Sequence, residues 1–307
     1  DFISDMYSSM KHLEDYYNWD STRPIIICEY AHTMGNSLGN FRKYWNLYNK
    51  YDRFQGGFTW DWMDQALRSK DEDGKEYWNI INYSDGSNTN DGLINPDRTP
   101  QPEMEELKKV FQYFNVRDID INTGIISISN ENYFVNASDV YMQWEIIENG
   151  EIIESGRIDT LNINPLESQL MEIKFDRAAI TPGNEYFMNF SFHLKDNQLW
   201  ADEGFIVSRE QIDFGLNHYV KEKDDIKKLP KLEITENKNN IVLIGDNFSA
   251  TFDKTKGGLS KLDYNNEEVV TETLLPYLWR TPTDNDEGGG SRSYADRWRQ
   301  AGLDKNE

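Results

Sequence analysis

One glutamate stands out as the residue best suited to chemistry. Ile25–Cys28 is a continuous apolar run, which is typical of a parallel strand buried on both faces. Glu29 follows it directly, and Tyr30, His32 and a Gly-Asn-Ser-Leu-Gly turn come next. α/β enzymes hold catalytic groups at such strand ends, although a strand-end glutamate can equally cap the strand or pair with a neighbour. The pattern alone leaves both interpretations open.

The residues around Glu29 resemble one enzyme family. The segments CEYAHTMGNSLGNFRKYW (28–45) and QGGFTWDWMDQAL (55–67) are similar to the large bacterial β-galactosidases of glycoside hydrolase family 2. The resemblance spans nearly the whole chain, and it is strongest at 23–66 and 277–286. It implies that Glu29, the glutamate of the CEYAH motif, is the nucleophile of a retaining glycosidase.

A retaining glycosidase needs a second carboxyl group, roughly 5–5.5 Å from the first, as acid and base. In the family this group comes from an Asn-Glu pair at the end of an earlier barrel strand. The Asn-Glu pairs of this chain begin at residues 130, 184, 266 and 306, and none follows a buried parallel strand. We therefore expect the acid/base to lie upstream, and we expect these residues alone not to hydrolyse unactivated galactosides.

The resemblance implies further site residues. Tyr7, in the segment SDMY, matches a tyrosine that hydrogen-bonds the nucleophile, and Met6 beside it could line the sugar site. His32 matches a histidine that contacts galactose hydroxyls, and Trp60 matches the wall on which the galactose ring stacks. Asn36 is expected to shape the turn after the nucleophile. Each residue also has an ordinary structural interpretation, as a rim, core or turn residue.

Two metals are implied by the same resemblance. The magnesium ligands of the family come from the upstream part of the barrel, so we expect no magnesium site here. The family's sodium pattern, Phe-Cys-x-Asn/Asp-Gly-Leu-Val, reads Asn88-Thr-Asn-Asp91-Gly-Leu-Ile in this chain. Asp91 keeps the side-chain oxygen that a hard cation prefers. The phenylalanine is replaced by Asn88, and the glycine-rich segment before it has become Asn79–Asp85, so a sodium site would depend on Asp91.

Composition excludes several function classes. The 307 residues carry a net charge of -22, which argues against nucleic acid or an anionic membrane surface as partner. No apolar run of 18 residues exists, so we expect no membrane span. The single cysteine excludes an internal disulfide and leaves the compartment open, cytoplasmic or periplasmic. Nine tryptophans and 17 tyrosines suit sugar-binding faces and β-sandwich cores alike.

Residues 1–113 alternate between strand and helix patterns. Strands are predicted near 2–6, 25–28 and 57–60, and helices over 10–17, 40–51 and 102–113. Such β-then-α units predict a parallel sheet, whereas a closed (β/α)₈ barrel needs about 250 residues. The resemblance implies the last three strands of a TIM barrel, with the first five upstream of a chain that starts within a domain.

Residues 114–220 change to strand patterns of period two. Strands are predicted at 119–129, 140–147, 157–163, 168–175, 185–195 and 204–208, with an Asn149-Gly150 hairpin turn. About seven strands predict an immunoglobulin-like β-sandwich, to which we assign a structural role.

The charged segment 221–232 is a predicted linker. Residues 233–307 are again β-rich, with strands at 240–244 and 248–253 and a turn at Gly257-Gly258. LWRTPTDNDEGGG (278–290) resembles the opening of the large C-terminal β-sandwich of the family. The loop at Gly288–Gly290 matches one that moves over the active site, although it could equally be a plain flexible loop.

The function we expect is part of a retaining β-galactosidase acting on terminal β-galactosides such as lactose. One alternative keeps the mechanism and changes the sugar to a β-glucuronide or β-mannoside. Another is a non-catalytic carbohydrate-binding or structural fragment. Family members are commonly dimers or tetramers, so we also expect a homo-oligomer. The half-barrel alone should expose sheet edges and aggregate or bind partners.

Overall fold

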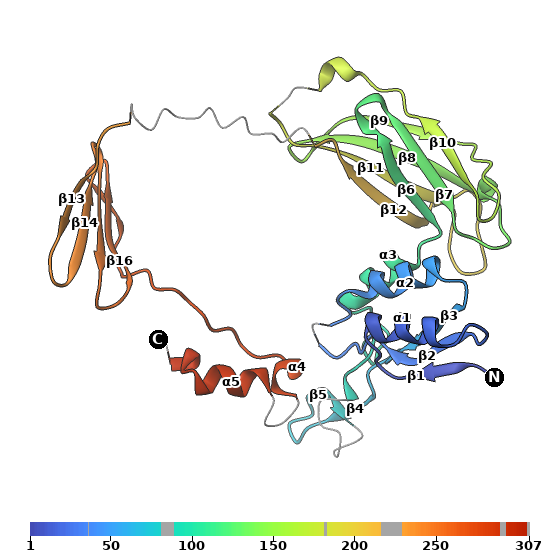
Figure 1. The fold of residues 1–307 in the computed structure, drawn as a ribbon, viewed down its shortest axis with the longest axis horizontal. Coiled ribbons are helices and arrows are strands. Elements are labelled where there is room, and N and C mark those ends of the chain that lie inside the picture. Colours follow the sequence, from blue (N-terminus) through green and yellow to red (C-terminus); the bar gives the residue numbers. More distant parts are fainter. Residues whose placement is uncertain (36, 81–88, 181–182, 216–228, 289–292, 306–307) are drawn as a thin grey trace. The chain divides into compact units, whose positions relative to one another are not determined.

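The computed structural model describes residues 1–35, 37–80, 89–180, 183–215, 229–288 and 293–305 (Figure 1). It divides into two units, residues 1–219 and 220–307. Within the predicted linker 221–232, residues 221–228 lie outside the described residues.

A three-stranded parallel sheet begins the first unit, as the sequence predicts. Its strands β1 (Ile3–Asp5), β2 (Ile25–Tyr30) and β3 (Phe54–Thr59) lie in the order β1-β2-β3. The helices α1 (Met10–Trp19), α2 (Phe41–Lys50) and α3 (Pro102–Phe111) pack apolar residues into one core with it. Three strands close no barrel in the part of the chain that the structure describes.

The two faces of this sheet differ in burial. Ile25 and Ile27 are fully buried beneath the helices. Gly57 on the neighbouring strand lies beside Ile27, and this position needs glycine because a Cβ there would come within 2.9 Å of the Tyr30 ring. On the other face Cys28 is exposed, and Phe58 is 67% exposed. The prediction of a strand buried on both faces is therefore wrong, because helices of this chain cover only one face.

The segment after β3 pairs with a distant one. Hydrogen bonds join the backbone of residues 61–65 to that of residues 89–94, including Asp61 N to Asp91 O at 2.6 Å and Leu93 N to Asp61 O at 3.0 Å. Between them lies a hairpin of β4 (Ala66–Lys70) and β5 (Glu76–Ile80), which the sequence analysis missed. Its signal is the turn Asp71–Gly74, where Gly74 has a φ of 80°.

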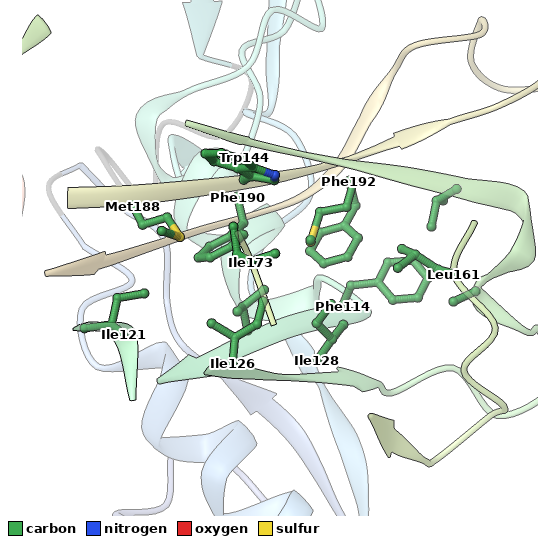
Figure 2. Close-up of a cluster of buried hydrophobic side chains, with 14 of the residues drawn as sticks. Phe114, Ile121, Ile126, Ile128, Trp144, Leu161, Ile173, Met188, Phe190 and Phe192 are labelled. Carbon is green, nitrogen blue, oxygen red and sulfur yellow. The ribbon is translucent and has the colours of Figure 1, made fainter. Parts of the chain in front are cut away.

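A β-sandwich of seven strands follows, as predicted. One sheet has the order β10-β7-β6, and the other has the order β12-β11-β8-β9. Their bounds are β6 (Phe114–Asp120), β7 (Ile125–Asn130), β8 (Val140–Glu148), β9 (Glu151–Ile158), β10 (Ser168–Glu172), β11 (Tyr186–Leu194) and β12 (Ile206–Asp213). Figure 2 shows Phe190 and Phe192 from one sheet meeting Ile126 and Ile128 from the other.

Two predicted strands of the sandwich are corrected. Residues 119–129 do not form one strand, because a 3₁₀ turn at Ile121–Thr123 and Gly124, with a φ of 78°, reverses the chain between β6 and β7. The strand predicted at 157–163 instead ends at Ile158. The hairpin at Asn149-Gly150 is confirmed, and both residues have the positive φ that a two-residue hairpin of this kind requires.

Helix α3 is fastened to the sandwich. Lys109 pairs with Glu210 of β12 at 2.6 Å, and Gln112 donates to the same carboxylate oxygen at 2.5 Å. The backbone N–H of Phe114 donates to the Ser208 hydroxyl at 3.2 Å. These contacts fix the helix against the edge strand β12.

The second unit begins with an antiparallel sheet in the order β13-β14-β15-β16-β17. Its strands are β13 (Glu233–Glu236), β14 (Asn240–Ile244), β15 (Phe248–Asp253), β16 (Gly258–Tyr264) and β17 (Glu267–Val270). Two short helices follow, α4 (Asp284–Glu287) and α5 (Tyr294–Gln300), where the sequence analysis expected only sandwich.

The first of these helices is held by its own motif. Both carboxylate oxygens of Asp286 accept from the Arg280 guanidinium, at 2.5 and 2.8 Å, and one accepts from the Thr283 N–H at 2.7 Å. These donors lower the pKa of Asp286 to about 2. The predicted Gly288–Gly290 loop starts here, and residues 289–292 lie outside the described part.

No helix in the described residues is long and apolar enough to span a membrane.

Candidate active site

The ends of β1 and β2 bring Tyr7 and Glu29 together. The Asp5 carboxylate accepts from the Met6 N–H at 2.9 Å and from the Ser8 hydroxyl, which turns the chain as β1 ends. The N–H of Tyr7 then donates to the carbonyl oxygen of Glu29 at 2.8 Å. The carboxyl ends of neighbouring parallel strands thus carry both residues, where α/β proteins place their sites.

Three residues here have a backbone conformation that is rare outside glycine. The φ angle is 52° at Tyr7, 100° at Glu29 and 54° at Ala31. Such φ values are sterically costly for residues with a Cβ, and they cluster at functional sites, where the surrounding structure enforces them. This strain marks the turn after β2 as a site candidate independently of any motif.

The Tyr7 hydroxyl is coupled to nearby carboxylates. Its pKa is raised well above the ordinary tyrosine value, chiefly by burial, then by a hydrogen bond to Glu29 and by the negative charges of Glu29, Asp91 and Asp61. The hydroxyl therefore keeps its proton throughout the physiological range. It can serve as a hydrogen-bond donor to an ionised Glu29.

Asp91 links two of the predicted site residues. One oxygen, Oδ2, lies 3.3 Å from His32 Nε2 and accepts from Trp60 Nε1 at 3.1 Å. The His32 ring in turn meets the Tyr7 ring edge-on, with 5.9 Å between their centroids. The structure thus brings Tyr7, Glu29, His32 and Trp60 into one neighbourhood through a carboxylate that sequence analysis considered only as a sodium ligand.

Asp91 is almost fully buried, with 2% of its surface exposed. Its other oxygen, Oδ1, has no hydrogen-bond partner among the described residues. Burial raises the pKa of this carboxyl, and His32 and the Trp60 N–H partly oppose that change. A buried carboxylate oxygen without a partner is costly unless a cation or another donor satisfies it.

Thr33 is a site residue that sequence analysis missed. Its N–H donates to Trp60 O at 2.8 Å, and its hydroxyl accepts from Asp61 N at 3.1 Å and donates to Asp91 O. The side chain is 1% exposed. Thr33 therefore ties three chain segments together, and nothing in its sequence context except its place inside the CEYAHT segment could have indicated this.

Asp64 is a second missed residue. Its carboxylate accepts from Gly92 N at 2.8 Å and from Gln101 Nε2 at 2.9 Å. A Cβ at Gly92 would lie 2.1 Å from the backbone nitrogen of Asp64, so the segment beside Asp91 needs glycine at this position. These contacts hold the Asp91 backbone against the segment that carries Trp60.

The remaining predicted residues lie on the open side of the site. Met6 is 54% exposed and Trp60 is 37% exposed, so both side chains can be reached by a ligand. Trp62 is 60% exposed and therefore lies outside the core. Asn36 lies outside the described residues, and so do Asn88 and most of the segment before it.

Metal binding is narrowly constrained. The described residues contain no group of three or more His, Cys, Asp or Glu side chains that could hold a metal ion. The unpartnered Oδ1 of Asp91 fits one ligand of a hard cation that is otherwise held by uncharged oxygens.

Three family models match consecutive parts of the chain. Residues 1–116 match "Glycosyl hydrolases family 2, TIM barrel domain", residues 126–215 match "Beta-galactosidase, domain 4", and residues 244–307 match "Beta galactosidase small chain". The order of the matches agrees with the order of the barrel strands, the sandwich and the second unit.

Curated relatives match the chain from end to end. A β-galactosidase of Priestia megaterium is 32% identical over 99% of this chain, and one of Halalkalibacterium halodurans is 33% identical over 99%. One of Clostridium acetobutylicum is 35% identical over 98%. The chain spans 30%, 30% and 33% of the length of these three relatives.

Proposed function

Since this chain belongs to glycoside hydrolase family 2, we propose that it supplies the nucleophile of a retaining β-galactosidase. The relatives named above are β-galactosidases. The observation that carries the proposal is the pairing of Glu29 with Tyr7 at adjoining strand ends, beside a His32–Asp91–Trp60 chain of polar contacts.

The nucleophile has to be an ionised and well-oriented carboxylate. Glu29 would attack the anomeric carbon of the sugar, forming a bond from its oxygen to that carbon as the glycosidic bond breaks. The Tyr7 hydroxyl, protonated at physiological pH, would hold the carboxylate in position by donating a hydrogen bond. Water would then hydrolyse the glycosyl ester and return Glu29 to its ionised form.

The leaving oxygen needs a proton that no carboxyl of this site is expected to give. The Asp61 carboxylate accepts hydrogen bonds from the residue 62 backbone and the residue 65 side chain. Asp64 accepts from the residue 92 backbone and the residue 101 side chain, and Asp91 contacts the side chains of residues 32 and 60. We assign the acid/base to sequence that the relatives have and this chain does not span. The chain alone would then bind but not turn over ordinary galactosides.

The sugar would be a terminal β-galactoside such as lactose. The His32 ring, which Asp91 holds through Nε2, and the exposed Trp60 ring offer a polar contact and a flat face, which suit the hydroxyl groups and the C–H face of one pyranose. A β-glucuronide or β-mannoside would use the same mechanism. A carbohydrate-binding fragment without catalysis is the alternative outside enzymes.

We also propose that a sodium ion uses Asp91 Oδ1 as one ligand. The buried oxygen without a partner supports this assignment, and a sodium ion there would supply positive charge beside the sugar pocket. Magnesium would be held by residues outside this chain. The homo-oligomer expected from the family stays a proposal as well.

Trapping of the covalent intermediate tests the nucleophile. The protein as its source produces it is incubated with a 2-deoxy-2-fluorogalactoside that carries a good leaving group, and peptides are mapped by mass spectrometry. We expect one stoichiometric label on the peptide that contains Glu29. A label on another carboxylate, or rapid inactivation without any label on this peptide, would reject the assignment.

The matched manno- and glucuronosyl reagents distinguish the sugar alternatives. Faster labelling of Glu29 by one of them than by the galactosyl reagent would keep the mechanism and change the substrate. The exposed Glu185, which belongs to an Asn-Glu pair in the sandwich, serves as the internal control and should stay unlabelled.

A further inference from the structure

A hollow of about 680 Å³ lies on the outer face of the four-stranded sheet of the sandwich. Side chains of β8, β11 and β12 line it, together with Lys109 at the end of α3. Its volume falls within the range of about 300–1,000 Å³ that is usual for small-molecule sites. The polar side chains of this lining belong neither to the proposed active site nor to the sandwich core.

Two cross-strand rows of polar residues form the floor of this hollow. One row runs Glu145, Asn189, Gln211, and the next runs Gln143, Ser191, Arg209. The residues of each row stand directly opposite one another on neighbouring strands, so their side chains project from the same face.

Part of this floor has unused hydrogen-bonding capacity. The side chains of Gln143, Glu145 and Arg209 make no hydrogen bond or ion pair within the described residues, whereas Gln211 donates to Asn189 at 2.9 Å. Gln143 and Glu145 are half-buried. A ligand that brings both donors and acceptors could therefore bond here without first breaking protein contacts.

His193 lines part of the hollow, and its ring is held in a rigid aromatic pair. The Tyr141 and His193 rings stack almost parallel, 4.8 Å apart and 4° from coplanar. The Arg157 guanidinium lies 3.6 Å above the Tyr141 ring, and the two nitrogens of His193 contact Gly204 O at 3.0 Å and Ser191 Oγ at 2.8 Å. These contacts fix the ring orientations before any ligand arrives.

Another part of the lining is formed where α3 meets β12. Lys109 and Glu210 are paired at 2.6 Å, so this part is built in advance and its charges cancel. The lining as a whole has two cations, Lys109 and Arg209, and two carboxylates, Glu145 and Glu210. A site with balanced charge and many amide and hydroxyl groups favours a neutral ligand rich in hydroxyl groups.

We propose that this outer sheet face is a binding site for a neutral oligosaccharide. The amides, the carboxylate and the guanidinium of the two rows would bond to adjacent sugar hydroxyls, with His193 bordering the sugar. This oligosaccharide site does not use Glu29, so it would bind its ligand whether the protein is an enzyme or a binding protein.

Hydrogen exchange of the whole chain with lactose as probe locates the binding. We expect lactose to slow amide exchange in peptides that cover 140–148 and 186–194. The double variant Gln143→Ala/Asn189→Ala should weaken this effect about tenfold or more, because two hydrogen-bonding side chains are lost. Digalacturonate, which is charged, should protect these peptides less than lactose does.

Two variants keep the test specific. Gln169→Ala removes an exposed amide from the other sheet and should leave the protection unchanged. Trp60→Ala, in the proposed active site, should also leave it unchanged. Absence of protection in 140–148 and 186–194 at saturating lactose, or protection that survives in the folded double variant, would overturn the proposal.

Discussion

The backbone N–H of Tyr7 donates to the carbonyl oxygen of Glu29 at 2.8 Å, and both residues have a positive φ. The bond joins the strained ends of two parallel strands. It therefore fixes where the Glu29 side chain leaves the sheet, which is a requirement for a nucleophile that has to meet a carbon atom at one angle.

In the intact protein, Glu29→Gln is expected to abolish turnover of a galactoside while the fold is kept. The substitution removes the charge and the nucleophilic oxygen and changes little volume. Turnover of an aryl galactoside and the thermal midpoint measure the two effects. Glu185→Gln on the sandwich surface is the matched control, and appreciable activity of Glu29→Gln would contradict the proposed role.

Thr33→Val should weaken substrate binding more than it slows the chemical step. It removes the hydroxyl that bonds to both Asp61 N and Asp91 O, and the loss of a buried hydrogen bond costs about 0.5–1.5 kcal/mol. Since Thr33 acts by positioning Trp60 and Asp91, KM should rise while kcat changes less. Thr33→Ser keeps the hydroxyl and should restore KM, and an equal KM in the valine and serine variants would contradict the positioning role.

Replacement of sodium tests Asp91. If Asp91 Oδ1 is a sodium ligand, activity of the intact protein should fall when sodium is exchanged for tetramethylammonium at constant ionic strength. Asp91→Asn should lose this response, because a neutral amide oxygen binds a hard cation more weakly. Asp97→Asn, in a nearby surface turn, should keep it. A response that persists in Asp91→Asn would remove Asp91 from the sodium site.

Helices and hairpins could be predicted where local sequence patterns indicate them. Strand ends and the burial of strand faces could not, because they depend on contacts with distant segments. The apolar spacing of Phe41 and Tyr48 predicts α2, and Asn149-Gly150 predicts its hairpin, because these signals are local. The strand predicted at 157–163 is misplaced because apolar residues recur at Leu161 and Ile163, beyond Ile158, where pairing with β8 ends. Burial of Cys28 was wrongly predicted because sequence cannot show which face of a strand lacks a cover.

The site was predicted through the resemblance and completed by geometry. The CEYAH motif and its neighbours indicated Glu29, His32 and Trp60. The structure adds that Asp91 bridges His32 and Trp60 and that Thr33 binds the Asp91 backbone. These contacts depend on pairing between segments about 30 and 58 residues apart, which no local sequence pattern encodes.

Alkaline pH should destabilise the helix-covered sheet through Tyr30. Burial raises the pKa of this hydroxyl to about 12, so the unfolded chain loses the proton first, near pH 10. The contribution of Tyr30 to the free energy of unfolding is fully present below about pH 10. It is lost as the pH rises to about 12, and the total loss is about 2–3 kcal/mol. Urea midpoints at rising pH measure it. Tyr30→Phe should flatten the decline, whereas Tyr133→Phe, at an exposed position, should not.

Gly156→Ala should destabilise the sandwich. A Cβ at Gly156 would lie 2.5 Å from the Trp144 ring, and Trp144 belongs to the buried core in Figure 2. The ring has to shift against its neighbours, at a cost of about 1–3 kcal/mol for such overpacking. Chemical unfolding followed by tryptophan fluorescence measures the loss. Ser155→Ala, on an exposed position of the same strand, should leave the midpoint unchanged, and an unchanged midpoint in Gly156→Ala would mean that the ring moves freely.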